Sequence, residues 1–162
     1  MSLEKAITVE INGVARELSA PANETLLDCL RRHGQFEVKS GCEKGDCGAC
    51  AVQIDGEAVD SCLTLAWMVE GKKVTTLEGL NDADSPHPLI AAFLEHGAVQ
   101  CGYCTPGIMI AAEAMLRDIP DPTDDDIALA LSGNLCRCTG YTKIFTAIKQ
   151  AAEVLRAGGG DD

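Results

Sequence analysis

The sequence has few aromatic residues and little positive charge. Only three Phe, two Tyr and one Trp occur in 162 residues, so any hydrophobic core must be built mainly from Ala, Leu, Ile and Val. Thirteen Lys and Arg stand against 25 Asp and Glu, which gives a formal net charge of −12. A chain this acidic is repelled by the phosphate backbones of DNA and RNA. We therefore expect no nucleic-acid partner.

Long hydrophobic runs are also missing. No apolar segment approaches the ~20 residues that a membrane-spanning helix requires, so no membrane span is expected. The first residues, MSLEKAITVE, lead into an alternating strand pattern and contain no basic segment followed by an apolar stretch. We therefore expect a cytoplasmic protein. In that compartment, nine cysteines indicate metal ligation and not disulfide bonds.

Residues 1–80 predict a small domain that contains both strands and a helix. Apolar residues alternate around Asn12-Gly13, and a second alternating pattern turns at Asp55-Gly56. Both dipeptides favour tight hairpin turns. A helical segment capped by Asn23 lies between the hairpins, and a further strand is expected around Val74. Two hairpins, one helix and a late strand are typical of a β-grasp domain.

The second half of the chain predicts a helical domain over residues 88–157. It follows a polar linker, residues 81–87, and precedes a short tail, residues 158–162, that we expect to be disordered. Apolar residues recur at spacings of three and four in each of four segments, which favours a four-helix bundle. The four helices are expected to begin at Pro88, after an N-cap at Thr105, after a capping box of Thr123 and Asp126, and after Gly140.

Eight of the nine cysteines form two groups of four. The first group has the spacing C-x4-C-x2-C-x11-C, which is that of plant-type ferredoxins. A glycine-rich loop can aim backbone N–H groups at an oxidised 2Fe–2S cluster with a charge of about −2. A structural zinc site normally uses two short C-x2-C units, so this spacing favours a plant-type, ferredoxin-like 2Fe–2S site. The expected ligands are Cys42, Cys47, Cys50 and Cys62.

The second group has the spacing C-x2-C-x31-C-x-C and consists of Cys101, Cys104, Cys136 and Cys138. Spacing alone leaves zinc and 2Fe–2S equally open here. Both cysteine pairs, however, lie just before a predicted helix, where unpaired N–H groups and the helix dipole favour an anion. This placement favours a second 2Fe–2S cluster.

A Rieske centre is excluded, because it needs two histidine ligands and no histidine of this sequence has a cysteine at the required spacing. The ninth cysteine, Cys29, lies on the apolar face of the predicted N-terminal helix. We expect it to be a core thiol with no ligand role.

Four motifs in sequence order carry a family resemblance: GCEKGDCGAC, SCL, QCGYCTPG and GNLCRCTGY. The chain resembles the small iron–sulfur subunit of molybdenum hydroxylases, the xanthine oxidase family, from about Ile7 to Ala157. This family includes bacterial carbon monoxide dehydrogenase, aldehyde oxidoreductases and N-heterocycle dehydrogenases. The resemblance implies an electron-transfer subunit with no catalytic residue of its own, because substrate turns over in a large partner subunit.

The resemblance also implies cofactors and partners. The large subunit binds molybdenum, in bacteria usually as molybdopterin cytosine dinucleotide, and a medium subunit binds FAD, so we expect a heterotrimer or its dimer. Electrons are expected to pass from molybdenum to the second cluster, then to the first cluster and on to FAD or another acceptor. Gln100 and Cys138 match residues that approach the pterin. The substrate stays open among purine, aldehyde, carbon monoxide and N-heteroaromatic compounds, as does the final acceptor.

Two other functions are compatible with the residues alone. One is a free-standing ferredoxin with two clusters and no fixed partner. The other is a zinc-stabilised interaction module without redox chemistry, which visible absorption distinguishes at once because zinc sites are colourless.

Overall fold

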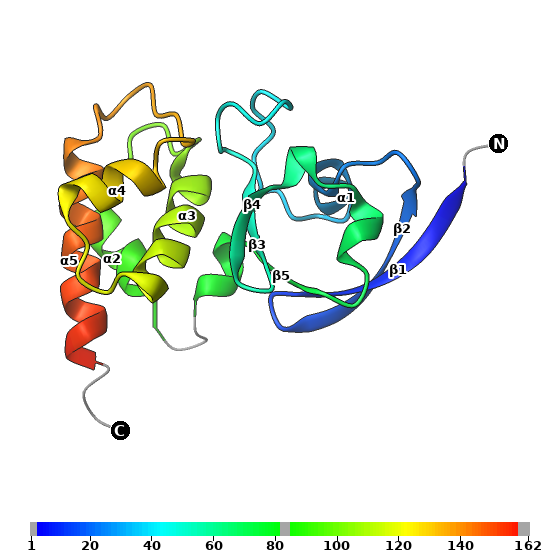
Figure 1. Ribbon diagram of the computed structural model, residues 1–162, viewed down its shortest axis with the longest axis horizontal. Coiled ribbons are helices and arrows are strands. Elements are labelled where there is room, and N and C mark those ends of the chain that lie inside the picture. The colour runs from blue at the N-terminus through cyan, green and yellow to red at the C-terminus, as the bar shows by residue number, and fades with distance from the viewer. Residues whose placement is uncertain (1–2, 82–84, 159–162) are drawn as a thin grey trace.

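The computed structural model describes residues 3–81 and 85–158, arranged in two parts that lie side by side (Figure 1). The N-terminal part is a mixed sheet with one α-helix, and the C-terminal part consists of helices. The predicted α+β class is confirmed. Within the described ranges, no helix is both long enough and apolar enough to cross a membrane.

The sheet has five strands in the order β2-β1-β5-β3-β4, and β5 joins two antiparallel hairpins. It runs parallel to β1 and antiparallel to β3. Both predicted turns are confirmed, because Asn12, Gly13, Asp55 and Gly56 all have positive φ, as a type I′ turn requires. The strands are β1 (Glu4–Ile11), β2 (Val14–Pro21), β3 (Ala51–Ile54), β4 (Glu57–Asp60) and β5 (Lys73–Thr75).

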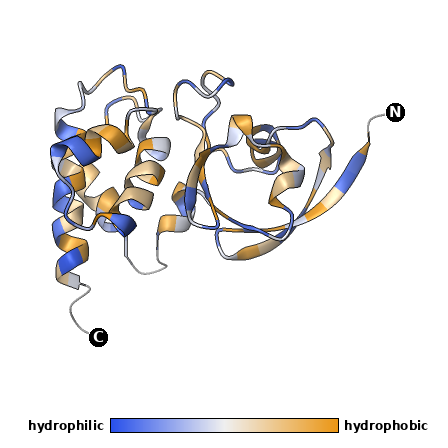
Figure 2. Ribbon diagram, in the orientation of Figure 1, coloured by the Kyte–Doolittle hydropathy of each residue, from blue (hydrophilic) through white to orange (hydrophobic). Residues whose placement is uncertain are grey.

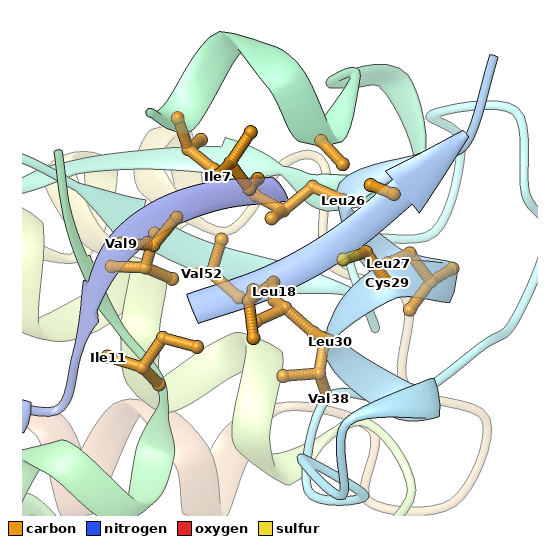
Figure 3. Packing of buried hydrophobic residues seen from close by; sticks show 14 of the residues in the cluster. Ile7, Val9, Ile11, Leu18, Leu26, Leu27, Cys29, Leu30, Val38 and Val52 are labelled. Atoms are coloured by element: carbon orange, nitrogen blue, oxygen red, sulfur yellow. The ribbon is translucent and has the colours of Figure 1, made fainter. Parts of the chain in front are cut away.

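Helix α1 (Leu26–Arg32) packs against the sheet and closes the first hydrophobic core (Figure 3). Its predicted cap was wrong: Thr25, and not Asn23, accepts the hydrogen bond from the Asp28 amide. Thr25 is extended and forms a β-bridge with Leu65, so this tertiary pairing determines where the helix begins. Fully buried side chains of this core include Ile7, Val9, Ile11, Leu26 and Leu30.

Four helices pack around a second core that is separate from the first. Hydrophilic and hydrophobic bands alternate along the longest of them, α5 (Figure 2), as expected for a helix with one buried face. Phe93, Ile108, Ile127 and Ile148 contribute one fully buried side chain from each helix. The helices are α2 (Pro88–Glu95), α3 (Thr105–Asp118), α4 (Asp124–Ala130) and α5 (Thr142–Gly158).

The boundaries of the C-terminal helices agree with the sequence in some places and differ in others. The capping box of Thr123 and Asp126 is confirmed at the start of α4. Thr105 was predicted as the cap of α3, but Cys104 takes that position: its backbone is already in the helical region and Thr105 is the first residue of the helix. Helix α4 ends at Ala130, before the predicted stop at Gly133.

Only part of the expected linker and of the expected tail lies within the described residues. Residues 82–84 of the expected linker and 159–162 of the expected tail lie outside the described residues. Gly158 is still helical, so α5 extends one residue into the expected tail. Two short 3-10 helices, Ser61–Leu63 and Ala66–Val69, lie between β4 and β5, and a third, Leu77–Leu80, follows β5.

Candidate metal centres

The loop from Gly41 to Cys50 carries three cysteines of the first group and leads into β3. Glu43, Gly45 and Gly48 have positive φ, which turns the backbone tightly around the loop. The Asp46 amide donates to Cys42 Sγ at an N–S distance of 3.2 Å. These backbone donors lower the pKa of the Cys42 thiol to about 7, the Lys44 amide contributing most. The loop therefore stabilises negative charge on sulfur, as a cluster ligand requires.

The remaining thiols of this group are held by the β3–β4 hairpin. Cys50 directly precedes β3, and Cys62 follows β4, so the strand register Ala51↔Asp60 brings them together. The Ser61 hydroxyl donates to the Cys50 carbonyl at 2.7 Å. Burial raises the pKa of the Cys50 thiol to about 12. At neutral pH such a buried thiol becomes a thiolate only when a metal supplies compensating positive charge.

The second group lies where two helices begin. Cys101 and Cys104 precede or cap α3, while Cys136 and Cys138 lie in the loop before α5. Cys101 Sγ and Cys138 Sγ are 3.6 Å apart. The thiols of Cys104 and Cys136 also contact each other directly. Each pair therefore combines one cysteine from each segment, which closes the long gap in the sequence.

Paired sulfurs are common to both groups. In the first group the pairs are Cys42 with Cys47 and Cys50 with Cys62. A 2Fe–2S cluster takes two thiolates on each of two irons, whereas structural zinc gathers four donors around one ion. Within residues 3–81 and 85–158, no three His, Cys, Asp or Glu side chains converge as a single-ion site requires. Two pairs of thiols in each group fit the two irons of a 2Fe–2S cluster.

Tyr141 organises the second cysteine loop, and the sequence analysis missed it. Its hydroxyl accepts from the Cys136 amide at 2.7 Å and donates to the Asn134 carbonyl at 2.9 Å. Thr139 Oγ1 lies 3.1 Å from Cys136 Sγ and accepts from the Tyr141 amide at 3.2 Å. The signal available in the sequence was CTGY, in which a tyrosine closely follows the last cysteine. In the structure this tyrosine has a positive φ of 67°.

The two cysteine groups line the same cavity. A cavity of 330 Å³ is lined by Cys42 and Cys47 from the first group and by Cys101, Cys104 and Cys138 from the second. The Leu135 amide donates to the Cys47 carbonyl at 3.0 Å, which links the segment before Cys136 to the first loop. The structure therefore places the two predicted centres next to each other.

The two groups differ in exposure. Cys50 and Cys62 are buried, whereas Cys101 and Cys138 are exposed. Gln100, predicted with Cys138 to approach the pterin, is exposed as well. These residues lie where a partner subunit can reach them.

Cys29 belongs to neither group. It is fully buried in the N-terminal core, and burial raises the pKa of its thiol to about 11. Its Sγ contacts His33 Nδ1 at 3.8 Å. This placement agrees with a packing role.

Two family models match the chain, one for each part. The model described as "2Fe-2S iron-sulfur cluster binding domain" matches residues 9–78. The model described as "[2Fe-2S] binding domain" matches residues 76–149. The chain therefore contains two 2Fe–2S binding domains, in the order in which the cysteine groups occur.

Similar proteins cover nearly the whole chain. The nicotinate dehydrogenase small FeS subunit of Eubacterium barkeri is 49% identical over 148 residues, which span 91% of this chain and 94% of the relative. The nicotine 6-hydroxylase small subunit of Paenarthrobacter nicotinovorans is 47% identical over 146 residues, 90% of this chain and 88% of the relative. The structure of quinoline 2-oxidoreductase from Pseudomonas putida 86 matches with a TM-score of 0.92 and 41% identity, covering 97% of this chain and 99% of that chain.

Proposed function

We infer the function of this chain from its family, because it belongs to the small iron–sulfur subunits of molybdenum hydroxylases, the xanthine oxidase family. It is the electron-transfer subunit of an oxidoreductase complex and carries 2Fe–2S clusters. Molybdenum-pterin and FAD belong to partner subunits of such complexes. The substrate is therefore oxidised in another chain, and this chain moves the electrons.

We propose two ligand sets, one for each domain. The first cluster is held by Cys42, Cys47, Cys50 and Cys62, and the second by Cys101, Cys104, Cys136 and Cys138. The observation that carries this proposal is that the fold brings distant members of each group together: the register Ala51↔Asp60 joins Cys50 to Cys62, and Cys101 Sγ lies 3.6 Å from Cys138 Sγ. Backbone amides in the first loop and two helix starts in the second supply the positive partial charge that a dianionic cluster needs.

The difference in exposure supports a direction of electron flow. We propose that the exposed edge formed by Gln100, Cys101 and Cys138 faces the pterin of the large subunit, in bacteria as molybdopterin cytosine dinucleotide. The second cluster then receives electrons first, and the first cluster, whose ligands Cys42 and Cys47 are half-buried, passes them to FAD in a medium subunit. Helices α2 to α5 act as a four-helix bundle that holds the receiving cluster. Their shared core keeps both cysteine segments of that cluster in place.

The same exposed edge favours a fixed partner over a free ferredoxin. Tyr103 and Leu135 are 48% and 58% exposed, and both line the cavity beside Cys101 and Cys138. In a free protein this apolar rim and two cluster ligands remain in water. A large subunit that covers them removes apolar surface from water, which stabilises the complex. We therefore propose a heterotrimer of large, medium and small subunits, or its dimer.

Isolation of the complex through a tag on this chain tests the proposal. We expect two larger chains to co-purify, and iron and acid-labile sulfide at two of each per cluster. Electron paramagnetic resonance of the reduced complex should show two distinct 2Fe–2S signals. Because the relatives compared above are named for nicotinate, nicotine and quinoline, the substrate panel should begin with N-heteroaromatic compounds and include an aldehyde for contrast. Stoichiometric zinc without a signal, or a chain that elutes alone with both clusters, would contradict the proposal.

A further inference from the structure

Helix α3 connects the two cluster sites. Cys101 and Cys104 lie at its start, and the helix packs along the β3–β4 hairpin, whose ends carry Cys50 and Cys62. Contacts with the N-terminal part include those of Gly107, Ile110, Glu113 and Arg117, which are spaced by three or four residues. They therefore lie on one face of the helix.

The far end of this face is fastened by polar contacts. The buried Gln53 of β3 donates to the Ile110 carbonyl at 3.4 Å, and its amide also contacts the Glu113 carboxylate. Arg117 donates to the Gly56 carbonyl in the hairpin turn. These bonds orient α3 along the hairpin.

The closest approach lies at the other end, beside the clusters. Gly107 faces the backbone of Gly48, in the loop between Cys47 and Cys50. A Cβ built on Gly107 would lie 2.0 Å from the Gly48 oxygen and 3.1 Å from its carbonyl carbon. Non-bonded carbon atoms are at their optimal separation near 3.5–4.0 Å, so any side chain here must push the two backbones apart. No side-chain rotation can relieve the contact, because the opposing atoms belong to the main chain.

The same carbonyl also contacts the other cysteine segment of the second site. Asn134, which is 6% exposed, donates from Nδ2 to the Gly48 oxygen at 3.2 Å. A Cβ on Gly48 would lie 2.4 Å from that Nδ2, and Gly48 has a positive φ of 65°. Gly48 is therefore enclosed between the start of α3 and the segment that leads to Cys136.

We propose that Gly107, Gly48 and Asn134 form a junction that sets the distance between the two clusters, with Gly107 as the positioning residue that permits the close approach. The junction contacts the first loop at Gly48, between Cys47 and Cys50. It contacts both cysteine segments of the second site, because Gly107 follows Cys104 and Asn134 precedes Cys136. Electron tunnelling falls steeply with distance, so this junction governs transfer between the clusters. The inference rests on the proposed function, since it requires both clusters.

Gly107→Ala in the assembled complex tests the junction. With both clusters reduced, their magnetic coupling falls with the cube of their separation, and it can be measured as a splitting of the resonance signals. We expect both signals to be retained, with a smaller splitting and a longer dipolar distance than in the wild type. Slower electron delivery to the acceptor should accompany that shift. A merely structural role would change stability without moving the splitting.

Gly133→Ala is the matched control, because a Cβ there meets no atom within 4 Å although the residue precedes Asn134. It should leave the splitting unchanged, and an equal shift in both variants would overturn the inference. If Gly107→Ala fails to assemble or loses a cluster, Asn134→Ala decides instead: it removes the bond to Gly48 without a clash, and a reduced splitting with both clusters present supports the junction.

An unchanged splitting in Gly107→Ala, or in Asn134→Ala where that variant decides, would overturn the inference. Failure of the proposed function is recognised separately, because the wild-type complex would then lack the two signals.

Discussion

The two cysteine sites solve the same chemical problem in different ways. The first surrounds sulfur with backbone amides of a tight loop and buries Cys50 and Cys62 at the ends of the β3–β4 hairpin. The second places its cysteines where two helices start and leaves Cys101 and Cys138 exposed. A dianionic cluster held at either site would be stabilised by N–H groups. The fold around each cysteine group therefore determines how exposed its thiols are. The exposed thiols of the second group are the ones that a partner subunit can reach.

Removing one ligand from each site tests this difference most directly. Cys138→Ser should disturb the second cluster and the molybdenum signal together, because the residue lies on the edge proposed to face the pterin. Cys50→Ser should leave molybdenum reducible by substrate but abolish delivery to the acceptor. Substrate-reduced molybdenum signals and flavin reduction in the assembled complex measure both effects. If only Cys50→Ser changed the molybdenum signal, the order of centres would have to be reversed.

The asymmetry within the first site predicts a difference in thiol reactivity. When the protein has been freed of iron by chelation, the Cys42 thiol has a pKa of about 7 and the Cys50 thiol has a pKa of about 12. The thiolate is the reactive form, so alkylation of Cys42 should rise through neutral pH and level off, while Cys50 stays slow until strongly alkaline pH. Mass spectrometry of chain labelled at several pH values measures the order. Buried Cys29, with a pKa of about 11, provides the internal slow control. Equal rates for Cys42 and Cys50 would refute the distinction.

Tyr141→Phe should weaken only the second site. The change removes both hydrogen bonds of the hydroxyl and leaves the Cys136 amide without that acceptor, so we expect a loss of about 1–3 kcal/mol in the free energy of unfolding. Thermal unfolding and the second cluster's signal should change while the first signal does not. Tyr103→Phe is the matched control, because its hydroxyl donates to Ser40 from an exposed position and its loss should cost less. Equal damage to both signals would argue against a local role.

Cys29→Ala should have the smallest effect on either cluster. The side chain is fully buried in the first core, so its truncation should cost about 1–2 kcal/mol of stability through lost packing. Iron content and both resonance signals should match the wild type. Loss of either cluster would show that the assignment of eight ligands is incorrect.

Local features of the fold were predictable from the sequence. The Asn12-Gly13 and Asp55-Gly56 turns, and the box of Thr123 and Asp126, depend on neighbouring residues alone, and all three are confirmed. The cap of α1 was missed because Asn23 and Thr25 are both suitable caps, and a bridge from Thr25 to the distant Leu65 selects one.

The same limit applied to the candidate site: local patterns were predictable, and contacts made by long-range packing were not. Cysteine spacing indicated the two groups, but it gave no information on which sulfurs pair, because the contact of Cys101 with Cys138 depends on how the helices pack. The contact of Gly107 with Gly48 was also hidden. Each glycine fits its local motif, and only the packing of α3 on the hairpin brings the two backbones together.

The order of the elements along the chain has a consequence for biosynthesis. Every cysteine of the first group, and every strand of the sheet through Thr75, precedes the helical half. A ribosome releases the N-terminal part first, and domains generally fold as units in that order. The first domain can therefore be complete before Cys136 has been translated. Docking of α3 against Gly48 is then a late step of maturation, so a chain truncated between Thr75 and Pro88 and released from the ribosome should already be competent to receive iron at its first site.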